Sequence, residues 1–314
     1  ESHSASFALL AYASAWIKRH YPAEFFCGLL NSLPMGFYAP AQLIQDAKRH
    51  GVEVRAICIN HSHWDHQLEY GASQPALRLG LRLAKGLQQD SAERLCAERQ
   101  RGLFTSPEDF TARVPLNKAQ RQCLIRADAL HGFELHRYQS LWRVAAMDNT
   151  PSLTPPRQNP FDAIELPGPG EFEDIRHDYR YTGVSLRRHP MKVLRRHPAF
   201  GDCICAEQLP AQRDDSAVGI AGLVTCRQRP GTASGVLFLT LEDETGNTNV
   251  VVWADLQQRF RREILTGQLL KVRGQMQKTA NPSPGAVPVI HVVARHISEY
   301  NALLEIDVAS HDFH

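Results

Sequence analysis

The chain has 314 residues, of which 43% are hydrophobic and 22% charged, so it is long enough for two or three domains and too apolar to be wholly disordered. Its 35 basic and 33 acidic side chains leave a net charge of +2, which excludes a strong overall attraction to nucleic acid; any basic surface must arise locally. The seven cysteines are odd in number and form no CxxC pair, and no apolar run approaches ~18 residues. We therefore expect free thiols, a soluble cytoplasmic protein and no membrane partner.

The N-terminal segment has the apolar spacing of an amphipathic helix. Apolar and small side chains recur at steps of three and four, at Phe7, Leu10, Ala11, Ser14 and Ile17. Lys18 and Arg19 complement the negative end of the helix dipole. Pro22 suits the first turn of a second helix over 23–31. The sequence also predicts a third helix over 41–50, capped by Gly51, and a short strand over 52–54.

A cluster of histidines in the linker-like segment 61–74 suggests different chemistry. His61, His63, Asp65 and His66 have the HxHxDH spacing of metallo-β-lactamase-fold hydrolases, and they follow a plausible strand. Such ligands would hold zinc and lower the pKa of a bound water. That fold, however, needs strands before the motif and a glycine-rich turn after it, whereas residues 1–50 have a helical pattern. The main interpretation therefore has no metal, and a zinc hydrolase remains an alternative.

Residues 76–148 have the pattern of two successive helix-hairpin-helix units. Helical periodicity is expected at Leu77, Leu79, Leu81 and Leu83, and the hairpin at 85–87 precedes a helix over 91–100. Helices over 107–114 and 118–129, the latter capped by Asn117, form the second unit. Hairpin amides of this motif bind DNA phosphates, so the candidate contacts are Lys85, Gly86, Leu87 and Lys118. A helical packing module without a ligand is equally compatible with the spacing.

The next segment, 149–215, combines a proline-rich linker with a basic connector. Within the linker, Gln158 and Phe161 are similar to residues of short peptides that dock on sliding clamps. Residues 175–200 hold seven Lys or Arg against one acid. A phosphate contact is one interpretation of this run, and a solvated surface is the other. The candidate contacts are Arg187, Arg188, Arg195 and Arg196.

From residue 218 the apolar period changes to two. The pattern predicts strands over 218–228, 236–241 and 248–253, a helix over 254–265, and strands over 268–278 and 287–297. Three strands, a helix and two strands are the order of the five-stranded OB barrel. Cationic strand faces would follow a single-stranded backbone, with candidates Arg227, Arg229, Lys271, Arg273 and Lys278. Phe238 and Trp253 could stack on bases, but their apolar surroundings favour burial in the barrel.

Specific residue strings in three parts of the chain carry a family resemblance. The first part includes Ser2-His3, Tyr21-Pro22-Ala23-Glu24-Phe25 and Pro34-Met35-Gly36-Phe37-Tyr38, the connector has His189-Pro190, and the last part includes Phe238-Leu239-Thr240-Leu241-Glu242-Asp243 and Asn249-Val250-Val251-Val252-Trp253. These strings resemble the C-terminal portion of bacterial C-family DNA polymerases, the DNA polymerase III alpha subunit family. The Pro-Met-Gly-Phe-Tyr segment is most similar to the error-prone subgroup.

The resemblance implies a multi-domain α+β architecture. Its parts would be distal polymerase fingers (1–75), a tandem helix-hairpin-helix module (76–148), a linker and basic connector (149–215), an OB-fold domain (216–300) and a tail (301–314). In such a protein Ser2, His3, Lys18 and Arg19 would lie on the nucleotide or template side of the fingers.

The resemblance also implies a function. The family extends a primer with Mg²⁺ held by palm carboxylates that lie upstream of the matching portion, so we expect this piece to hold DNA without catalysing synthesis by itself. The implied partners are single-stranded template and primer-template duplex, with the sliding clamp and an inactive Y-family-like polymerase as further expectations. A protein-interaction scaffold is the third alternative, after the DNA-holding portion and the zinc hydrolase.

Overall fold

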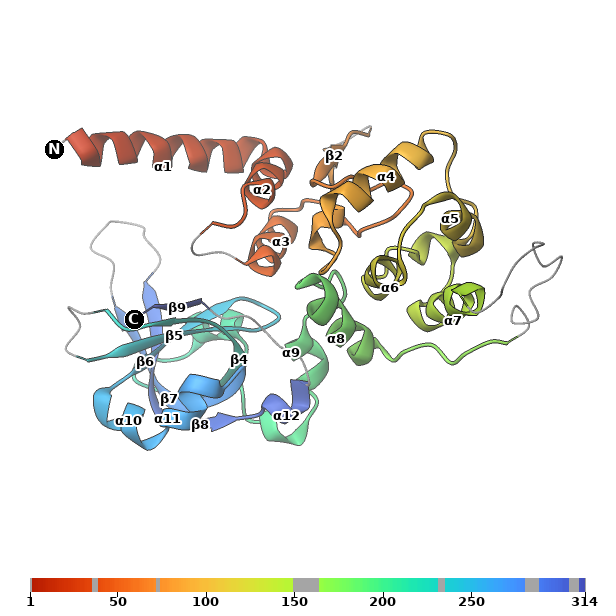
Figure 1. The fold of residues 1–314 in the computed structure, drawn as a ribbon. Coiled ribbons are helices and arrows are strands. Elements are labelled where there is room, and N and C mark those ends of the chain that lie inside the picture. The colour runs from red at the N-terminus through yellow and green to blue at the C-terminus, as the bar shows by residue number, and fades with distance from the viewer. Residues whose placement is uncertain are drawn as a thin grey trace. The chain divides into compact units, whose positions relative to one another are not determined.

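The computed structural model describes residues 2–35, 39–71, 74–148, 164–230, 235–279, 288–304 and 311–313. The chain divides into two compact units, residues 1–186 and 187–314 (Figure 1). In the described part of the chain, no helix has both the length and the apolar character needed to cross a membrane.

The first unit begins with three helices, as the periodicity predicted. They are α1 (Ser2–His20), α2 (Pro22–Asn31) and α3 (Pro40–Arg49), and Gly51 has the positive φ of +78° expected of a helix cap. Helix α2 buries Phe26 and Leu30. The apolar side chains of α1 are exposed, for example Leu10 at 62%.

A small sheet follows the helices, and the sequence pattern predicted only its first strand. Strands β1 (Val54–Arg55), β2 (Gln67–Glu69) and β3 (Ala76–Arg78) lie in the order β1-β3-β2. The predicted helical periodicity at Leu77 to Leu83 was wrong, because those leucines recur at steps of two. Leu77 and Leu79 are buried by strand geometry, and only one turn of 3-10 helix, η1 (Leu81–Leu83), follows.

The helix-hairpin-helix elements form the rest of this unit. Helix α4 (Gln89–Arg99) follows the first hairpin, and α5 (Pro107–Arg113) and α6 (Lys118–Arg126) form the second helical pair. The predicted cap at Asn117 is confirmed, since its side chain accepts from the Gln120 amide. A 3-10 turn, η2 (His131–Phe133), leads to α7 (Arg137–Asp148), and α8 (Glu171–Thr182) closes the unit.

A buried arginine joins α7 to α8. Only 1% of the Arg137 side chain is exposed. Its guanidinium nitrogens lie 3.0 Å from a carboxylate oxygen of Asp174, 2.7 Å from one of Asp178 and 3.5 Å from one of Asp128. Three carboxylates around one buried cation compensate its desolvation. These acids are therefore engaged inside the unit.

The second unit contains the barrel and the segment leading to it. Helix α9 (Pro190–Leu194) and the 3-10 turns η3 (Pro198–Phe200) and η4 (Ala206–Ala211) precede it. Its elements are β4 (Ala217–Gln228), β5 (Leu237–Glu242), β6 (Asn247–Val252), α10 (Ala254–Arg259), α11 (Arg261–Thr266), β7 (Leu269–Thr279) and β8 (Val289–Glu299). The short α12 (Asn301–Leu304) and β9 (His311–Phe313) complete the unit.

Strand pairing closes the barrel as the element order predicted. The sheet order is β5-β6-β8-β7-β4-β9, and β5 also pairs with β4, so five strands form a ring and β9 adds to the edge of β4. Alternate side chains fill the interior, including Val224, Leu239, Val250, Val272 and Met276. At Gly222 a Cβ atom would lie 2.7 Å from the Glu242 carbonyl oxygen, so only glycine permits this strand crossing.

Candidate nucleic-acid interface

The outer face of the barrel carries a groove of about 500 Å³. Its floor is built from every second residue of four strands, the set opposite to the one that fills the barrel core. The lining residues are Cys226 and Gln228 from β4, Val236, Phe238 and Thr240 at β5, Asn249, Val251 and Trp253 at β6, and Val289 and His291 from β8.

Two aromatic rings stand open to solvent in this groove. Phe238 is 36% exposed and Trp253 is 56% exposed, so the sequence-based preference for burial was wrong. The physical reason is parity: Leu239 and Val252 face the interior, so their neighbours Phe238 and Trp253 must face outward. Exposed rings beside amide and hydroxyl groups are suited to stacking and hydrogen bonding with flat polar molecules such as nucleobases.

The polar groups of the groove are few and are spread among the aromatic rings. Thr240 and Asn249 lie opposite each other on paired strands β5 and β6. His291 Nε2 lies 3.1 Å from Gln277 Oε1, which fixes the ring at the groove wall. The sequence signal for this site was one polar and one aromatic residue at the same strand parity in each of two strands, Phe238 with Thr240 and Asn249 with Trp253.

The strand arginine Arg227 does not lie on an open cationic face as expected. It is only 7% exposed, and it donates from Nε to Ile264 O at 2.7 Å and from Nη2 to Gly267 O at 2.5 Å. It therefore ties β4 to the end of α11. Arg229, just beyond the end of β4, is exposed.

The cations of β7 are also engaged within the unit. Lys271 is 7% exposed, forms an ion pair with Asp202 and donates to Ala199 O at 2.6 Å. Arg273 lies 2.8 Å from the same carboxylate. These hydrogen bonds, that of Lys271 first, lower the pKa of Asp202 to about 2. Lys278 Nζ donates to Pro210 O and Gln212 O at 2.8 and 2.6 Å.

In the basic connector, one arginine is held by two acids. Arg195 lies 2.8 Å from Glu244 and 3.3 Å from Asp243, with 18% of its side chain exposed. Arg187, Arg188 and Arg196 are exposed. Tight pairing of Arg195 removes it from the set of cations available to a ligand.

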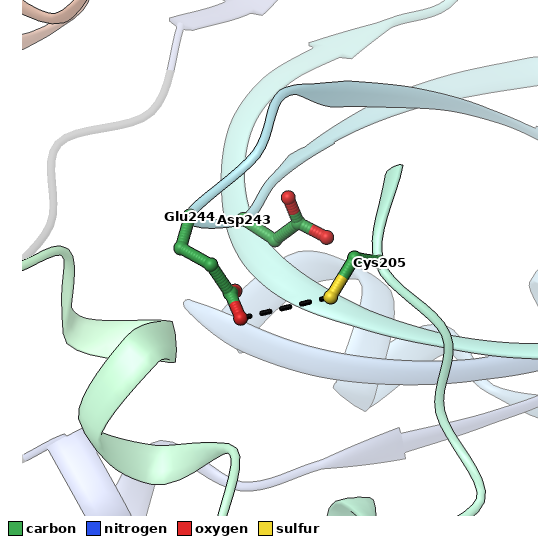
Figure 2. Close-up of side chains that lie close together, drawn as sticks. All are labelled: Cys205, Asp243 and Glu244. Atoms are coloured by element: carbon green, nitrogen blue, oxygen red, sulfur yellow. Dashed lines mark hydrogen bonds between the residues drawn. The ribbon is translucent and has the colours of Figure 1, made fainter. Parts of the chain in front are cut away.

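One group of metal-type ligands occurs among the residues that the structure describes. Cys205, Asp243 and Glu244 bring their ligand atoms within 4.8 Å of one another, and Cys205 Sγ lies 3.7 Å from Glu244 Oε1 (Figure 2). Asp243 already accepts from the amides of Ala206, Thr245 and Gly246 at 2.8 to 3.0 Å, and Arg195 supplies the positive charge. The group is therefore a structural junction, and it does not fit a magnesium site.

The histidine motif does not form a metal site either. No three of His61, His63, Asp65 and His66, all of them described, bring ligand atoms within 4.8 Å. His61 and His63 are exposed, whereas His66 is 3% exposed and its Nδ1 accepts from the Gly80 amide at 3.1 Å. Burial, and next the nearby Arg82, lower the pKa of His66 to about 4. The zinc hydrolase alternative therefore has no support.

In the first unit, the hairpin between η1 and α4 has the shape expected of a phosphate-binding turn. Gly86 has φ +91°, a backbone conformation that glycine adopts without strain and that a tight turn needs. Lys85 is exposed and donates to Tyr179 O at 3.1 Å, while Leu87 is buried. Helix α4 begins without a side-chain cap at Gln88, so its first amides receive no side-chain acceptor from that position.

The remaining predicted residues lie mainly on α1 and α6. His3 and Arg19 are exposed on α1, while Lys18 forms an ion pair with Asp46 at 2.6 Å. Lys118 is exposed in the first turn of α6. The Ser2 side chain and the clamp-type residues Gln158 and Phe161 lie outside the described residues.

Comparison with family models gives two matches. Residues 51–140 match a helix-hairpin-helix motif, and residues 218–299 match an OB-fold nucleic acid binding domain. The predicted fold class, a multi-domain α+β protein with both modules, is thus confirmed.

Curated relatives match along the full length of the chain. The error-prone DNA polymerase of Teredinibacter turnerae is 46% identical over 319 residues, and that of Methylococcus capsulatus is 45% identical over 334 residues. Each alignment covers 100% of this chain and 31% of the relative. The chain thus spans about a third of the length of these polymerases.

Solved structures show only a partial likeness. Asparaginyl-tRNA synthetase from Pyrococcus horikoshii matches with a TM-score of 0.26 and 20% identity, over 31% of this chain and 23% of that one. The Saccharomyces cerevisiae mitochondrial single-stranded DNA binding protein Rim1 matches with a TM-score of 0.23 and 15% identity, over 27% of this chain and 94% of that one.

Proposed function

Since this chain belongs to the error-prone DNA polymerase family over its full length, as the C-terminal portion, we propose that it holds DNA for such a polymerase. The observation that carries this proposal is the barrel groove, in which Phe238 and Trp253 are exposed together with polar side chains. Stacking on aromatic rings is the sequence-tolerant way to hold unpaired bases.

The groove is the proposed binding site for the single-stranded template. Bases must be unstacked from a duplex before they can lie on Trp253 or Phe238, so the ligand of this site is a single strand. Arg229, exposed just beyond β4, supports a phosphate contact with that strand.

The hairpin between η1 and α4 is the proposed binding site for double-stranded DNA. The uncapped amides at the start of α4 and the exposed Lys85 contact backbone phosphates, which carry no sequence information. In this proposal the groove binds single-stranded DNA and the hairpin binds duplex DNA. Neither site supplies a catalytic group.

Photo-crosslinking tests the groove directly. A short thymine-rich single strand carrying a photoreactive base is irradiated with the 314-residue protein, and the linked peptides are identified by mass spectrometry. We expect the crosslinks to fall on Trp253, Phe238 and His291. Crosslinks confined to α10 and α11, or no crosslinked product, would contradict the proposal.

The activity of the longer protein is a further proposal. Relatives about three times as long carry the name error-prone DNA polymerase, so the full-length protein would be a DNA-directed DNA polymerase that acts in the cytoplasm in DNA repair and translesion synthesis. Mg²⁺ would be held by the palm carboxylates that the family resemblance implies. Asp243 and Glu244 are already occupied by Arg195 and main-chain amides. The sliding clamp and an inactive Y-family-like polymerase are its proposed protein partners.

A primer-extension assay separates this portion from the full-length polymerase. Residues 1–314 alone with Mg²⁺, primer-template and nucleotides should extend no primer, while still shifting the labelled DNA in a gel. Extension by the purified portion would overturn the division of function proposed here.

A further inference from the structure

Two arginines from different helices converge on one tyrosine ring beside the hairpin. The Cζ atom of Arg126, at the end of α6, lies 5.5 Å from the centre of the Tyr181 ring, and that of Arg180, on α8, lies 5.7 Å from it. His177 stacks on the same ring at 5.6 Å with an interplanar angle of 14°. The ring therefore orders two guanidinium groups at one place.

This cluster is attached to the hairpin by hydrogen bonds to the main chain of α8. The Lys85 amide donates to Tyr181 O at 2.9 Å, and Lys85 Nζ donates to Tyr179 O at 3.1 Å. Gly183 ends α8 with φ +80°, and a Cβ atom there would lie 3.8 Å from Lys85 Cε. The end of α8 and the hairpin thus present Lys85 together with the two arginines.

Among the residues that the structure describes, no acid is paired with the arginines of the cluster. Arg126 and Arg180 are exposed, and within the described ranges neither forms an ion pair with a carboxylate. The acids of α8 are used elsewhere: Asp174 and Asp178 by Arg137, and Glu173 by Tyr138. Like charges held together without a counter-charge are stabilised by an anion.

We propose that Arg126, Arg180 and Lys85 bind backbone phosphates of a DNA duplex that lies on the hairpin, with Tyr181 as the platform that orients the arginines. This inference rests on the proposed DNA-holding function and extends its duplex site from the hairpin to α6 and α8. A guanidinium that lies over a ring keeps the N–H groups at its edge free for a phosphate, which it binds as a fork. The contact reads no sequence, because only phosphates are touched.

Fluorescence anisotropy with a blunt duplex of about 20 base pairs tests the site, at salt concentrations between about 50 and 200 mM. For the double variant Arg126→Ala, Arg180→Ala we expect about tenfold weaker binding at the lower salt. The slope of log K against log salt should fall by about 2, since two phosphate contacts are lost. The variant Arg126→Lys, Arg180→Lys should recover most of the slope.

The matched control removes two positive charges from a different surface. Arg261→Ala, Arg262→Ala on α11 changes the net charge equally, and both residues are exposed and belong neither to the hairpin nor to the groove. We expect its affinity and slope to remain those of the unmodified protein. Circular dichroism melting of every variant confirms that the fold is retained.

The outcomes distinguish failure of this site from failure of the proposed function. If the unmodified protein binds duplex and the alanine pair at Arg126 and Arg180 behaves like the control, this site is wrong while the DNA-holding function stands. If the unmodified protein binds neither duplex nor single strand, both fail. A loss of slope restricted to the cluster variant supports the site.

Discussion

The guanidinium of Arg227 shows how a strand arginine can serve the fold. It donates to the carbonyls of Ile264 and Gly267 at the end of α11. We predict that Arg227→Ala lowers the free energy of unfolding by about 3 kcal/mol, because two buried acceptors lose their donor. Single-strand affinity, measured below the melting temperature, should not change.

Urea denaturation and anisotropy together check this assignment. Arg229→Ala is the control, because Arg229 is exposed and lies two residues further along the chain. It should leave the free energy of unfolding within about 0.5 kcal/mol of the value for the unmodified protein, as is usual for a surface substitution. A stable Arg227→Ala protein with weakened DNA binding would show that the sequence-based role was right.

His66 gives a prediction about pH. Its folded pKa of about 4 lies below the ordinary value of 6.5, because burial disfavours the charged ring. Between these two values the unfolded chain binds a proton that the folded chain does not. Stability is therefore lost as pH falls from about 6.5 to about 4, at up to about 1.4 kcal/mol per pH unit from this residue.

The variant His66→Asn isolates that contribution. Asparagine can place an oxygen where Nδ1 accepts from the Gly80 amide, and it does not titrate. Denaturant unfolding at several pH values should show a shallower acid loss for the variant than for the unmodified protein. Identical pH profiles would mean that the pKa of His66 is the same in the folded and unfolded protein.

At the scale of elements, the hairpin depends on Gly86. A residue with a Cβ at φ +91° is strained, and that Cβ would lie 3.0 Å from Cys123 Sγ. We predict that Gly86→Ala lowers the free energy of unfolding by about 1 to 2 kcal/mol and weakens duplex binding.

Gly28→Ala is the matched control for this substitution. Gly28 lies within α2, and no atom lies within 4 Å of the position that its Cβ would take, so alanine should raise stability by about 0.5 to 1 kcal/mol. Thermal melting and duplex anisotropy of both variants provide the comparison. If Gly86→Ala binds duplex as tightly as Gly28→Ala, the hairpin is not the contact.

Local chemistry explains which elements could be predicted from the sequence. The helix start at Ser106 and Pro107, the cap at Asn117 and the period-two strands of the barrel follow from short-range rules, and the structure has them within a few residues. Of the sheet at 54–78, only a first short strand was predicted, at 52–54. The strands have two or three residues, too few to show a clear period.

Side-chain partners distant in sequence explain what was missed at the site. Lys271 looked like a cation on a strand face, but Asp202 lies 69 residues away and pairs with it. Arg126 and Tyr181 are 55 residues apart, and nothing in either segment indicates that they meet. For Phe238 and Trp253, the alternation of inward and outward side chains along a strand predicts exposure. Their apolar neighbours in the sequence suggested burial instead, and that prediction was wrong.

At the scale of the whole molecule, the net charge is too small to attract DNA, so binding must depend on local groups of charges. A net charge of +2 gives no long-range field, and several cations of the barrel unit are engaged by Asp202, Asp243 and Glu244. Binding should therefore depend on a few exposed contacts and on stacking. The two compact units each carry one of these contact types, the hairpin cluster in residues 1–186 and the groove in residues 187–314.

Binding of a thymine single strand by the Trp253→Ala variant is the sharpest test of the proposed function. Anisotropy should show a loss of about tenfold or more, because stacking on one ring contributes about 1 to 3 kcal/mol per base. Leu265→Ala, an equally exposed apolar truncation on α11 outside the groove, should bind like the unmodified protein. Equal affinities for the Trp253→Ala and Leu265→Ala variants would contradict the claim that this groove holds single-stranded DNA.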